Sequence, residues 1–403
     1  MKRALLGLLA LAGCDRPLPR HADAMSAIDR EDPGEDRLSY KWKFVTSDRR
    51  TEIAPQEFAA AAIDANTGML FIGSAEGTFY ALDEDTGHLI WKKHIGAMSC
   101  APLISGGVLY VGTSDGQLVA LDAQTGKPKW PKSYIARGPI EQTPSTTGDL
   151  IVFADEADQV VAIDAITGQF KWQYKSETPE EYTLRGHAGV RVDDQLLYTG
   201  FSNGTLVALR KDTGSVAWST SLKADADRFM DVDATPIVIK DTLYASSASG
   251  GVYAVDKATG LVRWRTPFYD VSQPSSTGNV GGLTTDGKLL YASVADLGTY
   301  AIDLAGNIVW RVGAKGGGEP GSPIVFEDLL IYTLAEDGMF LAERRTGATV
   351  EYFDPGDGVS AQPTVTADGR LFVMSNRGIL YAFDLDDDAG PTDRVREWFH
   401  GVF

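Results

Sequence analysis

Cysteine and histidine are scarce in this chain of 403 residues, and the few present are scattered. The two cysteines, Cys14 and Cys100, each need an explanation of their own. Of the five histidines, His88 and His94 flank a tryptophan but have no cysteine or carboxylate cluster beside them. Because a zinc site needs several such ligands at short spacing, the sequence predicts no metal site.

Basic residues are also in deficit, since 37 Lys and Arg stand against 55 Asp and Glu, a formal net charge of -18. A protein that binds nucleic acid through its phosphates needs a basic face, and none shows in the sequence. No nucleophile–base pair is visible, and the glycine-rich residues 313–323 lack the strand–GxxxxGK[ST]–helix form of a phosphate loop. We therefore expect no nucleic-acid partner, and the acidic surface favours solubility.

What the sequence has instead is an internal repeat. Residues 116–130 read GQLVALDAQTGKPKW, and near-copies bring the number of units to eight. The residues that end the apolar run of each copy are Asp83, Asp122, Asp164, Arg210, Asp256, Asp303, Glu343 and Asp384, spaced 39 to 47 residues apart. Each unit is rich in Val, Tyr, Ile, Leu and Trp and is punctuated by Gly, Asp, Thr and Ser, which indicates short strands joined by turns.

The second unit predicts four strands, at residues 101–104, 108–113, 117–122 and 127–130. Its third strand is apolar at consecutive positions, so both of its faces must be buried, and a single sheet cannot cover both. Stacked sheets that close radially can, which predicts an all-β, eight-bladed β-propeller of four-stranded antiparallel blades. The tryptophan that ends each unit is expected to fill the gap between adjacent blades.

The ring needs a closing strand, because the last copy has no tryptophan directly after Asp384. Residues 40–46 read as a lone fourth strand that carries Trp42, and we expect this N-terminal strand to close the ring. Trp398 competes for the role, but the sequence DDDAGPTD at residues 386–393 interrupts any turn that leads to it. The propeller is therefore expected at residues 40–385, followed by an acidic C-terminal tail at 386–403.

Two single residues carry smaller expectations. In the seventh unit Glu351 replaces the repeat tryptophan, which predicts a looser blade edge. Cys100 is expected to be a small buried hydrophobe and not a reactive thiol.

The N-terminus, MKRALLGLLALAGC, combines a positive start with an apolar run shorter than the about 20 residues that span a bilayer. This is the form of a signal peptide, assigned to residues 1–13. Its ending resembles a bacterial lipobox, which implies lipidation of Cys14; an ordinary secretory signal with an incidental cysteine is the alternative. Residues 14–39 are then the lipidated cysteine and a disordered tether. Asp15 resembles an inner-membrane retention signal that varies between lineages, so the choice of membrane stays open.

Three connections between repeats are unusually long, at residues 176–190, 223–236 and 269–282. Binding residues concentrate on loops held by a rigid scaffold, so we expect a docking site here. The first connection carries Tyr182, Leu184 and Arg185, and the second carries Arg228, Asp231 and Asp233. On a strand, Asp231 and Asp233 would share one face. The alternative is that both connections are loop ends that only close the ring.

The repeat AxDxxTGxxxW resembles the propeller repeats of quinoprotein dehydrogenases and of the BamB family of outer-membrane protein assembly factors. The lipobox, the eight copies, and the stretches EYTLRG at residues 181–186 and DRFMDVDATPIV at 227–238 are similar to the BamB family. The resemblance implies a non-enzymatic, cofactor-free lipoprotein, anchored through lipid on the periplasmic side of the outer membrane. It also implies docking of Leu184, Arg185, Asp231 and Asp233 on a POTRA domain of BamA, with unfolded outer-membrane proteins as further partners. Tyr182 stands where the family pattern has leucine.

Two other functions compete with this one. Quinone-dependent dehydrogenases share the repeat, but those relatives look longer, often carry a vicinal cysteine pair, and place a Ca²⁺ site and a catalytic Asp over the axis. No vicinal pair is present in this sequence. A generic lipid-anchored propeller that binds another periplasmic protein or ligand needs only the repeats.

Overall fold

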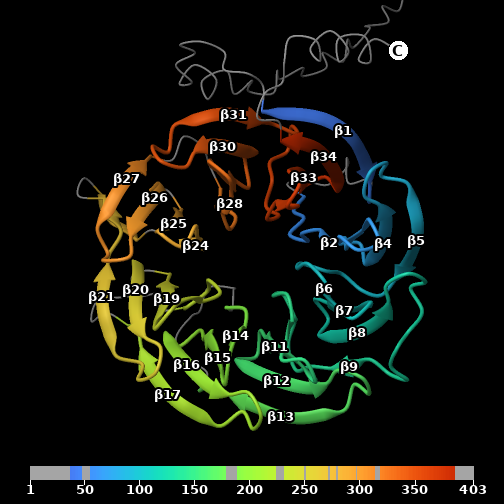
Figure 1. The fold of residues 1–403 in the computed structure, drawn as a ribbon, viewed down its shortest axis with the longest axis horizontal. Helices are drawn as coiled ribbons and strands as arrows, with labels where there is room; N and C mark the ends of the chain where they lie inside the picture. The colour runs from blue at the N-terminus through green and yellow to red at the C-terminus, as the bar shows by residue number, and fades with distance from the viewer. Residues whose placement is uncertain are drawn as a thin grey trace, which may run out of the picture. The chain divides into compact units, whose positions relative to one another are not determined.

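The computed structural model describes residues 37–47, 55–177, 188–223, 231–248, 251–270, 273–277, 280–295, 297–313 and 318–385. Every regular element in these ranges is a strand, and none of the described residues forms a helix suited to cross a bilayer. Eight four-stranded antiparallel sheets stand around a central axis (Figure 1). The predicted eight-bladed β-propeller is confirmed.

Each blade runs from a short inner strand at the axis to an outer strand at the rim. Blades one to four are β2 (Ala62–Asp64) to β5 (Leu89–His94) through β3 (Met69–Ile72) and β4 (Thr78–Asp83); β6 (Leu103–Ser105), β7 (Val108–Gly112), β8 (Gln117–Asp122) and β9 (Tyr134–Ile135); β10 (Ser145–Thr146), β11 (Leu150–Asp155), β12 (Gln159–Asp164) and β13 (Phe170–Lys175); and β14 (Arg191–Asp193), β15 (Leu196–Gly200), β16 (Thr205–Arg210) and β17 (Val216–Ser221).

Blades five to eight continue around the ring. They are β18 (Ile237–Ile239), β19 (Thr242–Ser247), β20 (Gly251–Asp256) and β21 (Val262–Thr266); β24 (Val280–Thr285), β25 (Leu289–Val294), β26 (Gly298–Asp303) and β27 (Ile308–Val312); β28 (Ile324–Phe326), β29 (Leu329–Thr333), β30 (Met339–Glu343) and β31 (Thr349–Phe353); and β32 (Thr364–Val365), β33 (Arg370–Met374), β34 (Ile379–Leu385) and β1 (Leu38–Val45). The third long connection is not only a loop, because β22 (Tyr269–Asp270) and β23 (Gln273–Thr277) form a hairpin within it.

The core lies in layers between adjacent blades. In β16, Leu206, Val207, Ala208 and Leu209 are all fully buried, so this strand packs against a neighbour on each face. Leu206 and Ala208 share a cluster with residues of blade five, and Val207 and Leu209 share one with residues of blade three. The continuous apolar run of each third strand is therefore explained by sheets that bury each other's faces.

The repeat motif is explained at the join between blades four and five. Asp256 Oδ1 accepts hydrogen bonds from the backbone N (2.9 Å) and Oγ1 (2.8 Å) of Thr259, which shapes the turn. Gly260 follows with φ of 77°, and a Cβ there would lie 2.6 Å from the ring of Trp218 in blade four. Trp218 Nε1 donates to the carbonyl oxygen of Lys257 at 3.0 Å. The pKa of the Asp256 carboxyl is lowered to about 2, first by its hydrogen bond with the Arg263 guanidinium and then by its hydrogen bonds with Thr259.

The hydrogen bond from a repeat tryptophan to the next blade recurs around the ring. The other tryptophan Nε1 groups that donate to a carbonyl of the next blade are those of Trp42 to Glu84, Trp91 to Ala123, Trp130 to Ala165, Trp172 to Lys211, Trp264 to Leu304 and Trp310 to Arg344. The predicted role of the repeat tryptophans as inter-blade wedges is confirmed.

The fourth strand of blade two differs from its prediction. It is β9 at Tyr134–Ile135. Residues 127–130 make only a bridge between Pro128 and Leu121 and two backbone hydrogen bonds to β8, from Asp122 N to Lys127 O and from Lys129 N to Ala120 O. Prolines at 128 and 131 cannot donate to a sheet ladder, which moves the paired segment further along the chain. Trp130 nevertheless keeps its inter-blade hydrogen bond.

The ring is closed by β1, as predicted. It pairs antiparallel with β34, from Leu38 opposite Leu385 to Val45 opposite Ile379, and buries Trp42. Glu351, predicted to leave its blade edge loose, instead accepts hydrogen bonds from the backbone N of Arg37 (2.7 Å) and of Leu38 (2.9 Å). Blade eight has no turn between its last two strands, β34 and β1, because β1 comes from the N-terminal part of the chain. At this position it presents the backbone N–H groups of Arg37 and Leu38, which need an acceptor such as Glu351 and not a tryptophan.

Cys100 is buried, with Sγ 3.8 Å from the carbonyl oxygen of Ile140. Burial raises the pKa of its thiol to about 12, so the thiolate does not form near neutral pH. The prediction of a small buried hydrophobe is confirmed.

Candidate functional site

The predicted docking residues belong to connections that run from an outer strand to the next inner strand. In antiparallel blades all such connections lie on one face of the ring, which we call the connection face. Tyr182, Leu184 and Arg185 fall between β13 and β14, and Arg228 falls between β17 and β18; all four lie outside the described residues. The described ends of the two connections, their stems, show how the ring holds them.

Both stems are held by one turn of blade four, Phe201–Thr205, which we call the blade-four turn. At the first stem, Asn203 Nδ2 donates to Ser176 Oγ and to the carbonyl oxygen of Glu177, each at 3.0 Å. At the second stem, Leu222 N donates to Gly204 O at 2.8 Å and Val232 N donates to Phe201 O at 3.3 Å. The two connections singled out by the sequence are thus held by the same turn. We call this turn, with the residues that support it, the bracket.

Asp158 of blade three supports the bracket from the other side. Its carboxylate accepts hydrogen bonds from Ser202 N (3.1 Å) and Ser202 Oγ (2.8 Å), and its backbone oxygen accepts Ser176 N at 2.9 Å. Asp158 has φ of 57°, at a position where Gly116 and Gly204 stand in the neighbouring blades. A non-glycine residue in this region costs about 1–2 kcal/mol, which the inter-blade hydrogen bonds offset.

The bracket residues Asp158, Ser202 and Asn203 were not predicted. One signal was available: in this turn of blade three, ADEADQ, aspartate stands where glycine is expected in TSDGQ and SNGT of other blades. The contacts themselves join residues 26 to 44 positions apart, so they depend on the register between blades.

Asp231 and Asp233 are not on a strand, so the premise that they share a strand face is wrong. Asp231 is fully buried and Asp233 is half-buried, while Val232 between them is also fully buried. A Cβ on Gly200 would collide with Val232, so the Val232 side chain can pack here only because residue 200 is glycine. The backbone oxygen of Asp231 accepts Ala248 N at 2.8 Å, which ties the second stem to blade five as well.

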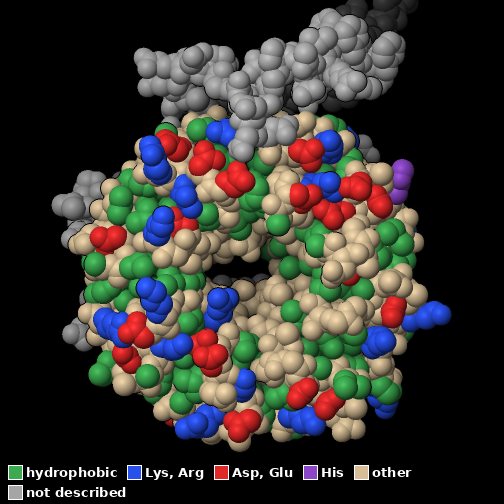
Figure 2. Space-filling view, in the orientation of Figure 1, with side chains coloured by type: hydrophobic (Ala, Val, Ile, Leu, Met, Phe, Trp, Pro, Cys, Tyr) green, Lys and Arg blue, Asp and Glu red, His purple; other side chains and the backbone are tan. Residues whose placement is uncertain are grey.

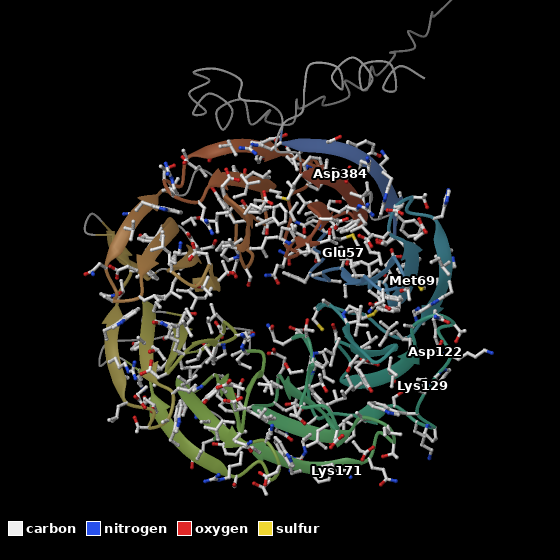
Figure 3. All side chains as sticks on the ribbon, in the orientation of Figure 1. Glu57, Met69, Asp122, Lys129, Lys171 and Asp384 are labelled. Carbon is white, nitrogen blue, oxygen red and sulfur yellow. The ribbon has the colours of Figure 1, made fainter. Side chains whose placement is uncertain are left out.

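A buried apolar side chain at the position of Val232 recurs in three other connections. Met98, Ile140 and Val359 occupy the position of Val232 in other connections and are fully buried. In the connection from β1 to blade one the position is taken by Glu57, which is also fully buried and whose Oε2 accepts Ala75 N at 2.8 Å. Figure 3 places Glu57 on the inner side of blade one, toward blade eight. The labelled Asp122, Lys129 and Lys171 lie toward the rim instead.

Replacing Asn203 with alanine should loosen the first stem. Its two hydrogen bonds to the first stem are lost, together with the one that Asn203 Oδ1 accepts from Thr205 N. This lowers the free energy of unfolding by about 1–2 kcal/mol and speeds local opening. Amide hydrogen exchange of peptides that contain Ser176 and Glu177 should rise in the variant. Asn66→Ala is the matched control, because Asn66 bonds only to Asp64 in an exposed turn on the opposite face. Unchanged exchange at Ser176 and Glu177 would show that the bracket does not hold the stem.

Comparison with known proteins gives a consistent result. The family model described as outer membrane protein assembly factor BamB matches residues 42–134 and 75–312, more than half of the 403 residues. No curated protein sequence matches the chain.

Solved structures share the fold. BamB from Moraxella catarrhalis superposes with a TM-score of 0.70 at 21% identity over 86% of this chain and 99% of that one. Quinohemoprotein alcohol dehydrogenase from Comamonas testosteroni gives 0.69 at 16% identity over 88% of this chain and 77% of that one. The computationally designed Ika8 protein gives 0.67 at 14% identity over 87% of this chain and 100% of that one. At these identities the likeness establishes the propeller and not an activity.

Proposed function

Because this chain belongs to the family of outer membrane protein assembly factor BamB, we propose that it is a non-enzymatic scaffold of the outer-membrane β-barrel assembly machinery. The family match over residues 42–312 carries the proposal. In this role the connection face docks on the POTRA region of a BamA-like protein, and unfolded outer-membrane proteins are the substrates that the machinery handles.

The stems support this docking mode. A presented loop binds best when its ends are fixed in advance, because less conformational entropy is lost on binding. The blade-four turn fixes the stems of both connections at once, through Asn203, Gly204 and Phe201. In the proposal Leu184 and Arg185 contact the partner, aided by Tyr182, Arg228 and Asp233, whereas the buried Asp231 holds the stem.

The lipid on Cys14 belongs to the same proposal and lies outside the described residues. An acylated cysteine would keep the propeller at the periplasmic surface of a membrane without a spanning helix. The mass of the N-terminal peptide recovered from outer-membrane and inner-membrane fractions decides both the modification and the choice of membrane.

Charge reversal at Arg185 tests the docking site. The Arg185→Glu variant should lose at least about 30-fold in affinity for the purified POTRA region of BamA from the same organism, because interface arginines are frequent hot spots worth 2 kcal/mol or more. Binding is measured by pull-down and by surface plasmon resonance. Arg210→Glu is the matched control, since Arg210 is an exposed arginine at the end of β16 on the opposite face. Equal binding by Arg185→Glu and wild type would remove this site, and no binding by wild type would refute the partner.

A quinone-dependent dehydrogenase is the second candidate, because quinohemoprotein alcohol dehydrogenases share the propeller. Such a role needs oxygen ligands for Ca²⁺ gathered at the axis. Among the described residues no group of three His, Cys, Asp or Glu is placed to hold a metal ion. The part of the chain that the structure describes therefore offers no such group of ligands, and no reaction step is assigned to it.

A further inference from the structure

A cavity of about 400 Å³ lies on the propeller axis. Its lining comes from blades two, three, four, five and eight, including Thr143 of blade three, Thr235 of blade five and Gln362 of blade eight. Residues from opposite sides of a ring can share one cavity only at its centre. Figure 2 shows the corresponding opening in the middle of the ring, with a Lys or Arg side chain at its edge.

The lining is polar and carries a single charge. Thr143, Thr235 and Gln362 are exposed to the cavity, and Arg191 is the one charged residue among those that line it. Thr235 Oγ1 accepts Gly189 N at 3.0 Å, which fixes that hydroxyl and leaves its proton available to donate. The lining residues include no carboxylate.

Several other described arginines, in blades five, seven and eight, pair with carboxylates, whereas Arg191 does not. Arg263, Arg344 and Arg370 each pair with carboxylates, at distances that include 2.7 Å for Arg263 to Asp256 and 3.1 Å for Arg344 to Asp286. Arg191 makes no ion pair with a described residue. In a chain of net charge -18, an arginine without a carboxylate partner is a local reversal of the overall field.

The position of Arg191 is also exceptional within the repeat. It is the first residue of inner strand β14, and the corresponding positions in other blades are uncharged: Leu103, Ser145, Ile237, Ile324 and Thr364. Neither the inter-blade packing nor the stems of the connections use its guanidinium. A charged side chain at this place therefore points to a ligand on the axis.

We propose that the axial cavity binds a small organic carboxylate, with the Arg191 guanidinium as its anchor. A guanidinium pairs with a carboxylate through two parallel hydrogen bonds. Thr143, Thr235 and Gln362 supply neutral hydrogen-bonding groups for the rest of the ligand. The volume lies within the range of small-molecule pockets and suits a molecule of amino-acid size.

Isothermal titration of the intact protein with N-acetyl-L-glutamate tests the site, and inorganic phosphate serves as the second titrant. Saturable binding of the carboxylate that weakens about tenfold or more in Arg191→Gln supports it, since a charge-assisted hydrogen bond is lost. Arg191→Lys should retain part of the affinity, and Arg210→Gln should retain all of it. Raised salt should weaken binding in wild type.

Three results would overturn the proposal: absence of saturable binding, equal binding by wild type and Arg191→Gln, or tighter binding of phosphate than of the carboxylate. A thermal melt of each variant shows that it is folded. Because Arg191 is exposed, its substitution should leave the fold intact. The titration uses no partner protein, so its outcome is independent of the docking experiment.

Discussion

Replacing Trp218 with alanine should lower the free energy of unfolding by about 3–5 kcal/mol, the cost typical of removing a buried aromatic side chain. Trp218 is 9% exposed, packs against Tyr198 at a ring-centroid distance of 5.9 Å and covers Gly260 of the next blade. Its removal also leaves the carbonyl of Lys257 without this donor. Because Trp218 packs in the layer between blades four and five, its loss weakens the contact between these two blades. Urea denaturation followed by tryptophan fluorescence and circular dichroism measures the change in stability.

Val216→Ala is the control on the same strand. Val216 is 46% exposed, so its truncation should change stability by no more than about 0.5 kcal/mol. A Trp218→Ala variant as stable as Val216→Ala would mean that the repeat tryptophans do not hold the blades together.

A chain that begins at Ser47, and so lacks β1, should lose its cooperative unfolding transition. Without β1, strand β34 becomes an unpaired edge, and the cluster of Trp42 with Leu82, Phe372 and Leu380 is opened to water. Each such side chain contributes roughly 1.5–3 kcal/mol when buried, so the sum rivals the whole stability of a typical domain. Differential scanning calorimetry should show a broad or absent transition.

A chain that begins at Arg37 keeps β1 and serves as the control. A synthetic peptide of residues 37–46, added in excess to the shortened chain, should restore the transition by occupying the edge of β34. A shortened chain that melts sharply and within a few degrees of the control would show that seven blades and three strands suffice.

The repeat predicted most of the fold because one physical constraint acts on every unit. A strand such as Leu206–Leu209, apolar at consecutive positions, must have a sheet on each side, and eight units at one period close a ring. The turn signals then located the strands. The prediction for the fourth strand of blade two was wrong, because Pro128 has no N–H to donate to the sheet although the repeat motif continues to Trp130.

The candidate site was harder to predict for a different reason. The sequence located the connections through their length, but the shared face expected of Asp231 and Asp233 depended on a strand, and neither residue lies on one. What organises the stems is the contact of Asn203 with Ser176 and of Val232 with Phe201, between residues that only the closed ring brings together. Arg191 likewise appears as an ordinary polar residue in the sequence. The residues that line the axial cavity with it come from distant blades, which only the closed ring brings together.

The pairing of β1 with β34 has a consequence for biogenesis. Leu38 and Leu385 sit opposite each other, so the last blade contains the first and the last strands of the described chain. During synthesis β1, which carries Trp42, has no partner strand until residue 385 has been made. The ring can therefore close only after residue 385 has been synthesised, and until then β1 is a strand without its partner.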